Sequence, residues 1–368
     1  MKENKGLLLE DFLKRDRNNL DLFRIIASCL VIVGHSYVLF PKGNQEDVFR
    51  LWTTFTYSGA LAVKLFFFIS GLVVTNSLLQ KKDIVDFAIS RTFRIFPALL
   101  LVLVATSLII APFLSSFSPA QYFDTPSVYV YIKQNIVLNT NYNLPKVFEK
   151  NTYANAVNGS LWTLPYEVGC YLFLCAMFLL SIITHKKIGS IICIAIIIDT
   201  LLPQKLFLNW LWDNNEIIYL PASFFAGVLL ALNKDKYYIS FRHFIGFALL
   251  TYLLWHTKYA EILFCFSMFS LTLYVSSLQW FMKLKPKYDF SYGIYLWGFF
   301  VQQNAEYFMP GSNIYLKMIL SLIISIVFGA LSWFIIEERS IRLGKNLIKK
   351  INNRRGTNSA ALDFNENK

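Results

Sequence analysis

The sequence is poor in charge and in histidine for a chain of 368 residues. Asp, Glu, Lys and Arg make up 16% of it, against about a quarter in an ordinary soluble domain, while 55% is hydrophobic. The five cysteines lie in apolar segments, and none has metal-ligand spacing to any of the four histidines. A soluble fold, a disulfide framework and a metal site are therefore not predicted, and the cysteines are expected to be small buried hydrophobic residues.

Long hydrophobic runs are abundant instead. They predict an all-α, polytopic integral membrane protein with about ten transmembrane helices. The first run carries Arg24, lacks a small-residue cleavage site and is followed by further runs, so it is not expected to be a signal peptide. The ten segments are 20–40, 58–79, 95–114, 160–183, 187–202, 216–233, 241–255, 261–280, 290–309 and 315–336.

Basic residues are distributed unevenly between alternate loops. With a cytoplasmic N-terminus, 25 of the 35 lysines and arginines fall on the inner side and 8 on the outer side. The positive-inside rule then predicts N-in and C-in. It also assigns the net charge of +12 to loops that face an anionic membrane leaflet, with no nucleic-acid partner. We expect a membrane domain over 1–340 and a basic cytoplasmic C-terminal tail over 341–368, disordered from Arg354.

Arg24 and His35 lie in one apolar segment, eleven positions apart. At about 100° per residue they share one helix face, and they are separated by about 16 Å along the axis. A cation and an imidazole on one stripe of a membrane helix are costly to retain, so both are candidate functional residues.

Arg91 and Arg94 begin the third segment at its inner end. Residues at i and i+3 share a helix face, and two guanidiniums there suit phosphate oxygens. Simple positive-inside anchoring is the alternative. Lys81 and Lys82 could add to a phosphate site or only anchor the second helix.

Glu167 follows the start of the fourth segment and is expected about 9 Å deep, where a carboxylate needs a partner. It could orient His35 and stabilise its protonated form, or it could be a structural carboxylate paired with Lys64. Ser70 and Gly71 form a small pair in the second segment, and Ser70 offers a donor. Tight helix packing is the alternative interpretation of that pair.

Taken together, these residues resemble acyltransferase family 3, the ten-helix membrane O-acyltransferases of bacteria. The similar motifs occur in family order over nearly the whole chain. They are Arg24 with His35, Phe66–Gly71, Arg91–Pro97, Ser160–Glu167, Phe225–Gly227, Ser291–Trp297 and Ile336–Glu337.

Gly298 stands where many family members have a histidine, so no second catalytic histidine is expected there. The run that follows, with Gln302 and Gln303, is similar to the branch of O-antigen and exopolysaccharide O-acetyltransferases, although Phe300 replaces its proline. No extracytoplasmic esterase domain of the kind that larger members append is expected from this sequence.

The resemblance implies a multi-pass protein of the bacterial cytoplasmic membrane that uses cytoplasmic acetyl-CoA as donor. The implied acceptor is a hydroxyl of a lipid-linked or cell-surface glycan. His35 would act as base or acyl carrier, Glu167 would support it, Arg24 and Ser70 would stabilise the oxyanion, and the Arg91 and Arg94 pair would hold coenzyme A. A glycolipid or small-molecule transporter is the rival class, but no inverted repeat supports it.

Overall fold

The computed structural model describes residues 6–41, 45–202 and 219–366, and within them the fold is helical apart from one short strand pair. In that pair, Leu7 of β1 (Leu7–Leu8) lies opposite Ile239 of β2 (Tyr238–Ile239) in antiparallel register. The main apolar helices are α2 (Leu20–Leu39), α4 (Ser58–Lys81), α5 (Ile84–Val104), α8 (Leu164–Leu179), α9 (Lys186–Asp199), α11 (Tyr219–Leu232), α12 (Phe241–Leu253), α13 (Ala260–Ser276), α15 (Ser291–Phe308) and α16 (Ile314–Ser332).

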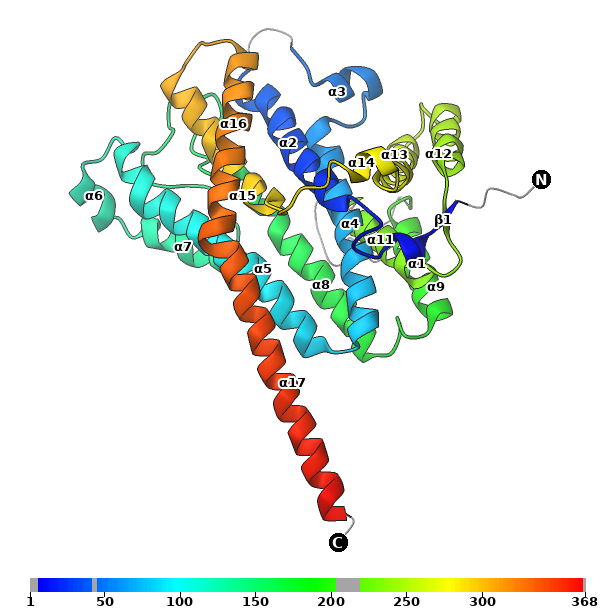
Figure 1. The fold of residues 1–368 in the computed structure, drawn as a ribbon. Coiled ribbons are helices and arrows are strands. Elements are labelled where there is room, and N and C mark those ends of the chain that lie inside the picture. The colour runs from blue at the N-terminus through cyan, green and yellow to red at the C-terminus, as the bar shows by residue number, and fades with distance from the viewer. Residues whose placement is uncertain (1–5, 42–44, 203–218, 367–368) are drawn as a thin grey trace.

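Shorter elements connect and extend this bundle. A single turn, η4 (Trp333–Glu337), joins α16 to the long helix α17 (Glu338–Glu366), which projects from the rest of the molecule (Figure 1). The remaining elements are α1 (Leu9–Phe12), α3 (Val48–Thr53), η1 (Ala105–Ile110), η2 (Ala111–Phe113), α6 (Pro119–Asp124), α7 (Ser127–Ile136), η3 (Gly159–Thr163), α14 (Gln279–Met282), η4 (Trp333–Glu337) and α17 (Glu338–Glu366).

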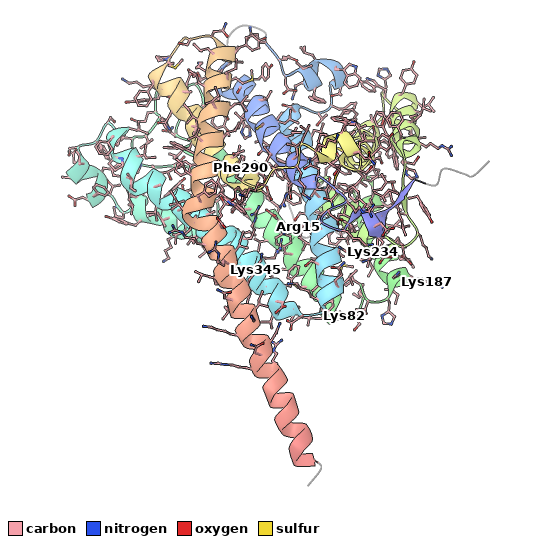
Figure 2. The ribbon with its side chains drawn as sticks, in the orientation of Figure 1. Arg15, Lys82, Lys187, Lys234, Phe290 and Lys345 are labelled. Atoms are coloured by element: carbon pink, nitrogen blue, oxygen red, sulfur yellow. The ribbon has the colours of Figure 1, made fainter. Side chains whose placement is uncertain are left out.

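The helical membrane character predicted from the apolar runs is confirmed. Within the described residues, five helical stretches are long and apolar enough to cross a membrane, and three further apolar helices are shorter. Each of the ten predicted segments coincides with a helix, although residues 216–218 of the sixth lie outside the described residues. Ten spans and the N-in, C-in orientation stay predictions. Figure 2 shows Lys82 and Lys187 at the end of the bundle from which α17 extends.

Glycines bring α4 and α11 into direct backbone contact. A Cβ atom on Gly71 would lie 2.0 Å from the carbonyl oxygen of Phe224, and one on Gly227 would lie 2.2 Å from that of Phe68. No side chain fits at either position, because a backbone carbonyl cannot move aside as a flexible side chain can. The packing role of the Ser70 and Gly71 pair is therefore confirmed, and it fixes the position of the neighbouring Ser70.

Glycines also seat α15 between α16 and α2. Gly293 and Gly329 face each other, since a Cβ atom on Gly293 would lie 2.9 Å from the Cα atom of Gly329. A Cβ atom on Gly298 would lie 2.8 Å from Cγ1 of Ile32, one turn before His35 on α2. A side chain at position 298 would therefore require the side chain of Ile32 to shift.

Two predicted boundaries were wrong. Helix α5 begins at Ile84 and not near 95, because Asp83 caps it by accepting hydrogen bonds from the backbone N–H groups of Val85 and Asp86. Arg91 therefore lies two turns inside the helix. At the C-terminus, the backbone stays helical through Glu366, although the polar composition after Arg354 predicted disorder; no proline interrupts that stretch.

Candidate active site

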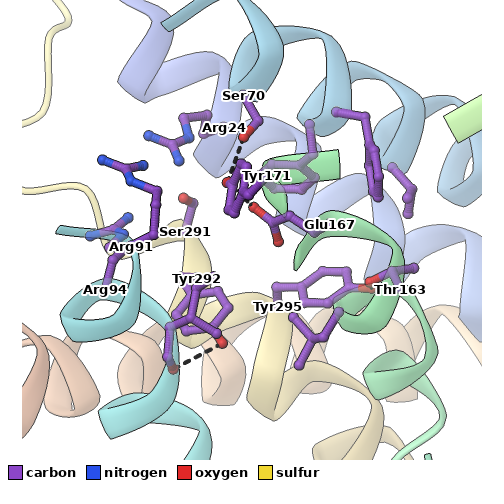
Figure 3. Close-up of a pocket in the computed structure, with 15 residues that line it drawn as sticks. Arg24, Ser70, Arg91, Arg94, Thr163, Glu167, Tyr171, Ser291, Tyr292 and Tyr295 are labelled. Atoms are coloured by element: carbon purple, nitrogen blue, oxygen red, sulfur yellow. Dashed lines mark hydrogen bonds between the residues drawn. The ribbon is translucent and has the colours of Figure 1, made fainter. Parts of the chain in front are cut away.

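Five of the six candidate site residues line one pocket of about 700 Å³ in the middle of the bundle, which we call the central pocket. Helices α2, α4, α5, α8 and α15 contribute to its walls. Figure 3 shows the three arginines on one side of this pocket, with Glu167 and Tyr171 on the other side. The five predicted residues in it are Arg24, Ser70, Arg91, Arg94 and Glu167.

One carboxylate holds two of the arginines. Oδ2 of Asp289 lies 3.0 Å from a guanidinium nitrogen of Arg24 and 2.8 Å from one of Arg94. Burial alone would raise the pKa of Asp289, but the two guanidiniums outweigh it and lower that pKa below its ordinary value. The second oxygen of Asp289 accepts a hydrogen bond from the hydroxyl of Ser291. The carboxylate is therefore ionised, and it joins α2, α5 and the start of α15.

The third arginine has a different environment. Nε of Arg91 is buried, and it has no hydrogen-bond partner among the residues that the structure describes. Glu337 lies on the far side of Arg94, with 4.0 Å between the charged groups, and is itself buried with Ser332 as a hydrogen-bond donor. The arginine side of the pocket thus retains guanidinium donors that an anionic ligand could use.

A chain of hydrogen bonds crosses the opposite side of the pocket. The hydroxyl of Tyr171 donates to Oε1 of Glu167 at 2.5 Å and lies 2.7 Å from the hydroxyl of Ser70. A phenol carries one proton, so Ser70 must donate to the oxygen of Tyr171. Residues 167 and 171 share a face of α8 because they are four positions apart. In this arrangement the proton of Ser70 is engaged, whereas the predicted oxyanion role required it to be free.

His35 lies elsewhere. It lines a second cavity of about 990 Å³ together with Lys64, Trp162 and Glu261. We call this cavity the outer chamber, because it lies on the side predicted to be extracytoplasmic. Its ring meets Phe299 edge-on with 5.4 Å between centroids, and its Nδ1 has no hydrogen-bond partner within the described ranges.

The central pocket and the outer chamber adjoin each other. Val63 and Tyr295 line both, so these two side chains form a common wall. A ligand that extends past this wall would connect the arginines with His35.

Both suggested partners of Glu167 were wrong. Glu167 is bonded to Tyr171 and shares no pocket with His35. Lys64 pairs with Glu261 at the first turn of α13. The spacing within one helix could place these side chains by depth, but it could not show which neighbouring helix each one faces.

A third cavity adjoins Arg24 on its other side. Its space amounts to about 1350 Å³, part of it open to solvent, and besides Arg24 and Asp289 it is lined by Arg15, Lys285 and Lys287. We call it the basic cavity. It lies at the start of α2 and before α15, on the side predicted to be cytoplasmic. Sequence reasoning took these lysines only as topology signals, and it missed Asp289, although a carboxylate directly before an apolar segment is an available signal.

Comparison with known proteins agrees with the motif resemblance. Residues 17–338 match the family described as "Acyltransferase domain". A protein described as "O-acetyl transferase" from Shigella phage Sf6 is 26% identical over 340 residues, which cover 88% of this chain and 95% of that protein. "Nodulation protein 10" from Rhizobium leguminosarum bv. viciae is 30% identical over 160 residues, 43% of each chain.

No solved structure gives a significant match. The family match spans most of the chain and includes both the central pocket and the outer chamber. The chain therefore belongs to acyltransferase family 3 and is a membrane acyltransferase.

Proposed function

We propose that this enzyme transfers an acetyl group from acetyl-CoA to a hydroxyl group of a lipid-linked or cell-surface glycan. It would do so in the bacterial cytoplasmic membrane, with the surrounding lipid bilayer as its solvent. The observation that carries the proposal is the meeting of Arg24, Arg91 and Arg94 in one pocket beside a basic cavity. The O-acetyl transferase similarity of the phage relative supports the choice of acyl group.

The donor set suits coenzyme A. Its phosphates need several cationic donors, and the basic cavity supplies Arg15, Lys285 and Lys287 at the predicted cytoplasmic side. Aromatic side chains of Tyr288 and Trp333 also line that cavity, and their ring centroids are 6.1 Å apart. They offer apolar surface for an adenine ring. The nucleotide would therefore bind in the basic cavity, and the extended pantetheine arm would enter the central pocket past Arg24.

The pantetheine arm must span a long distance between the arginines and His35. Arg24 and His35 lie about 16 Å apart along α2, and the wall of Val63 and Tyr295 lies between their cavities. An extended pantetheine arm is long enough for such a path, whereas the thioester of a donor bound only at the surface would stay far from His35. We therefore infer that Arg91 and Arg94 hold the phosphate end of the arm and that the thioester lies near the wall.

The chemical step follows from this placement. His35 takes the proton of the acceptor hydroxyl as its oxygen attacks the thioester carbonyl. The carbon–sulfur bond then breaks, and the proton passes from His35 to the departing thiolate, which leaves as free coenzyme A. The carbonyl oxygen becomes negative in between, and a nearby guanidinium or hydroxyl group stabilises it. Arg24 lies on the same face of α2 but about 16 Å from His35, so we assign it to the phosphates of the donor and not to the oxyanion.

The experiment uses the purified full-length protein in lipid nanodiscs. Coenzyme A is titrated by calorimetry, and acetyl transfer to glycan from a deletion strain is measured by mass spectrometry. The proposal predicts saturable coenzyme A binding and an added mass of one acetyl group per modified sugar. Glycan that keeps the same mass with the enzyme and acetyl-CoA present would overturn it. Movement of unmodified glycolipid across vesicles without coenzyme A would favour the transporter class.

A further inference from the structure

The outer chamber contains a buried ion pair that the catalytic motifs do not include. Lys64 of α4 hydrogen-bonds Glu261 of α13, and Nζ of Lys64 also lies 5.2 Å from the ring centroid of Tyr219. The side chain of Lys64 is 4% exposed and that of Glu261 is 20% exposed. Removing two charges from water costs several kcal/mol per ion, so a buried pair is weak evidence for stability, and its surroundings indicate its role.

The pair faces open space in the chamber. Lys64 and Glu261 both line the outer chamber, as does His35. A carboxylate that accepts one bond from an ammonium group keeps further lone pairs, and the ammonium keeps further protons. Donors and acceptors are therefore available side by side, while the two charges cancel each other.

The remaining walls are largely aromatic. Trp162, Tyr219 and Tyr295 enter the chamber from three different elements, namely η3, α11 and α15. Small-molecule sites combine such apolar, aromatic walls with a few well-placed polar groups. A pyranose ring fits this combination, because its C–H faces can pack on aromatic rings while its hydroxyl groups donate and accept around the edge.

We propose that the outer chamber binds one neutral pyranose ring of the acceptor glycan, and that the Lys64–Glu261 pair selects this ring and turns one hydroxyl towards His35. The inference rests on the proposed function, since it names the site and the chemical class of its acceptor. Lys64 and Glu261 are positioning residues in it, because His35 performs the proton transfer. Within the pair the charges cancel, so the position beside it favours a neutral ring, and the carboxylate of a uronic acid there would be repelled by Glu261; Arg50, which also lines the chamber, is exposed.

The chain offers a matched control for a purely structural ion pair. Lys317 of α16 and Glu306 of α15 also form a buried pair, with side chains 3% and 11% exposed. Nζ of Lys317 likewise lies over an aromatic ring, that of Phe40, at 4.6 Å from its centroid. This second pair has the same chemistry, but it does not line the outer chamber.

The experiment compares Glu261→Gln with Glu306→Gln in the full-length protein in nanodiscs. Acceptors are a panel of neutral p-nitrophenyl pyranosides with their uronic acid counterparts, together with glycan from the deletion strain. We expect Glu261→Gln to raise the acceptor KM at least tenfold and to reorder the neutral pyranosides, while coenzyme A affinity stays within twofold. Glu306→Gln should lower the melting temperature but leave acceptor KM and ranking unchanged.

The outcomes separate the two proposals. An unchanged acceptor KM and ranking in Glu261→Gln, or an equal change in Glu306→Gln, overturns the acceptor site while wild-type transfer upholds the proposed function. A wild-type enzyme that transfers acetyl to no glycan or glycoside overturns both. If Glu261→Gln does not fold, the double variant Lys64→Gln with Glu261→Gln keeps a hydrogen-bonded amide pair without charge. Wild-type selectivity in that variant would also overturn the inference.

Discussion

The central pocket and the outer chamber share a wall, yet they neutralise their cations differently. In the central pocket, Arg24 and Arg94 share the carboxylate of Asp289, and Glu337 lies 4.0 Å from Arg94. The buried Nε of Arg91 has no partner within the described residues. Several guanidinium donors therefore remain available on one side of that pocket. Such a site suits a ligand that brings its own negative charge.

In the outer chamber the principal cation has a carboxylate of its own. Lys64 is bonded to Glu261, and the exposed Arg50 also lines the chamber. A closed pair offers hydrogen bonds but little net attraction for an anion. The difference agrees with the proposed division of the reaction, in which one cavity holds an anionic donor and the adjoining cavity holds a hydroxyl-bearing acceptor. The predictions below test this division, in order of decreasing effect.

The largest effect is expected from His35→Ala. Losing a general base lowers the rate by about 10²- to 10⁴-fold. Coenzyme A affinity should stay near the wild-type value, because the arginines lie in the other cavity. The measurement is acetyl transfer with saturating donor, and His256→Ala, outside both cavities, is the control. Wild-type transfer by a well-folded His35→Ala protein would remove His35 from the mechanism.

Arg91→Ala and Arg94→Ala test whether the central pocket binds the anionic donor. A hydrogen bond to a charged group contributes about 1.5–3 kcal/mol, so each change should weaken coenzyme A binding by about ten- to a hundredfold. Calorimetric titration measures this. The acceptor KM should change little. Arg342→Ala is the control, because Arg342 lies on the exposed face of α17 and pairs only with Glu338 among the interactions described. Unaltered donor binding in both variants would reduce these arginines to topology anchors.

Arg24→Lys should have a smaller effect. Lysine keeps the charge but loses the planar group that meets Asp289 at 3.0 Å. Loss of about 1.4 kcal/mol corresponds to about tenfold lower kcat/KM. The assay is steady-state transfer at several donor concentrations. Equal activity of the lysine variant would mean that only the charge of Arg24 matters, as in positive-inside anchoring.

The smallest effect is expected from Gly298→Ala, compared with Gly71→Ala. The new methyl at 71 meets the carbonyl oxygen of Phe224 and must separate α4 from α11, at about 1–3 kcal/mol for overpacking. The methyl at 298 meets only the side chain of Ile32, which can shift. Thermal unfolding in one detergent compares them. A larger loss of melting temperature in Gly298→Ala would contradict the packing argument.

The sequence of each apolar segment alone was enough to predict where its helix lies and which of its residues are candidates for chemistry. The apolar runs indicated where helices lie, because burying a helix in lipid requires a continuous stretch of apolar side chains. The cost of a charge in such a stretch singled out Arg24, His35 and Glu167. The ordered motifs identified the family, and the family match over residues 17–338 confirms it.

The ends of helices were predicted less accurately than their apolar middles. The start of α5 was predicted eleven residues too late, because hydropathy marks the apolar part of a helix and not its cap. Asp83 is a residue type that caps helices, and it was visible in the sequence. The turns that follow it are polar, however, so hydropathy did not mark them as part of the helix. As a result Arg91 was expected at the start of the helix, whereas it lies two turns inside it.

The sequence by itself determined the helical membrane class, the family and the residue types available for chemistry. Only the tertiary structure decided the pairings: Glu167 with Tyr171, Asp289 with Arg24 and Arg94, and Lys64 with Glu261. Helix periodicity sets which residues share a face, but the partner of that face depends on packing. Here packing follows from contacts between distant segments, such as the glycine-lined approach of α4 to α11, which no single segment encodes.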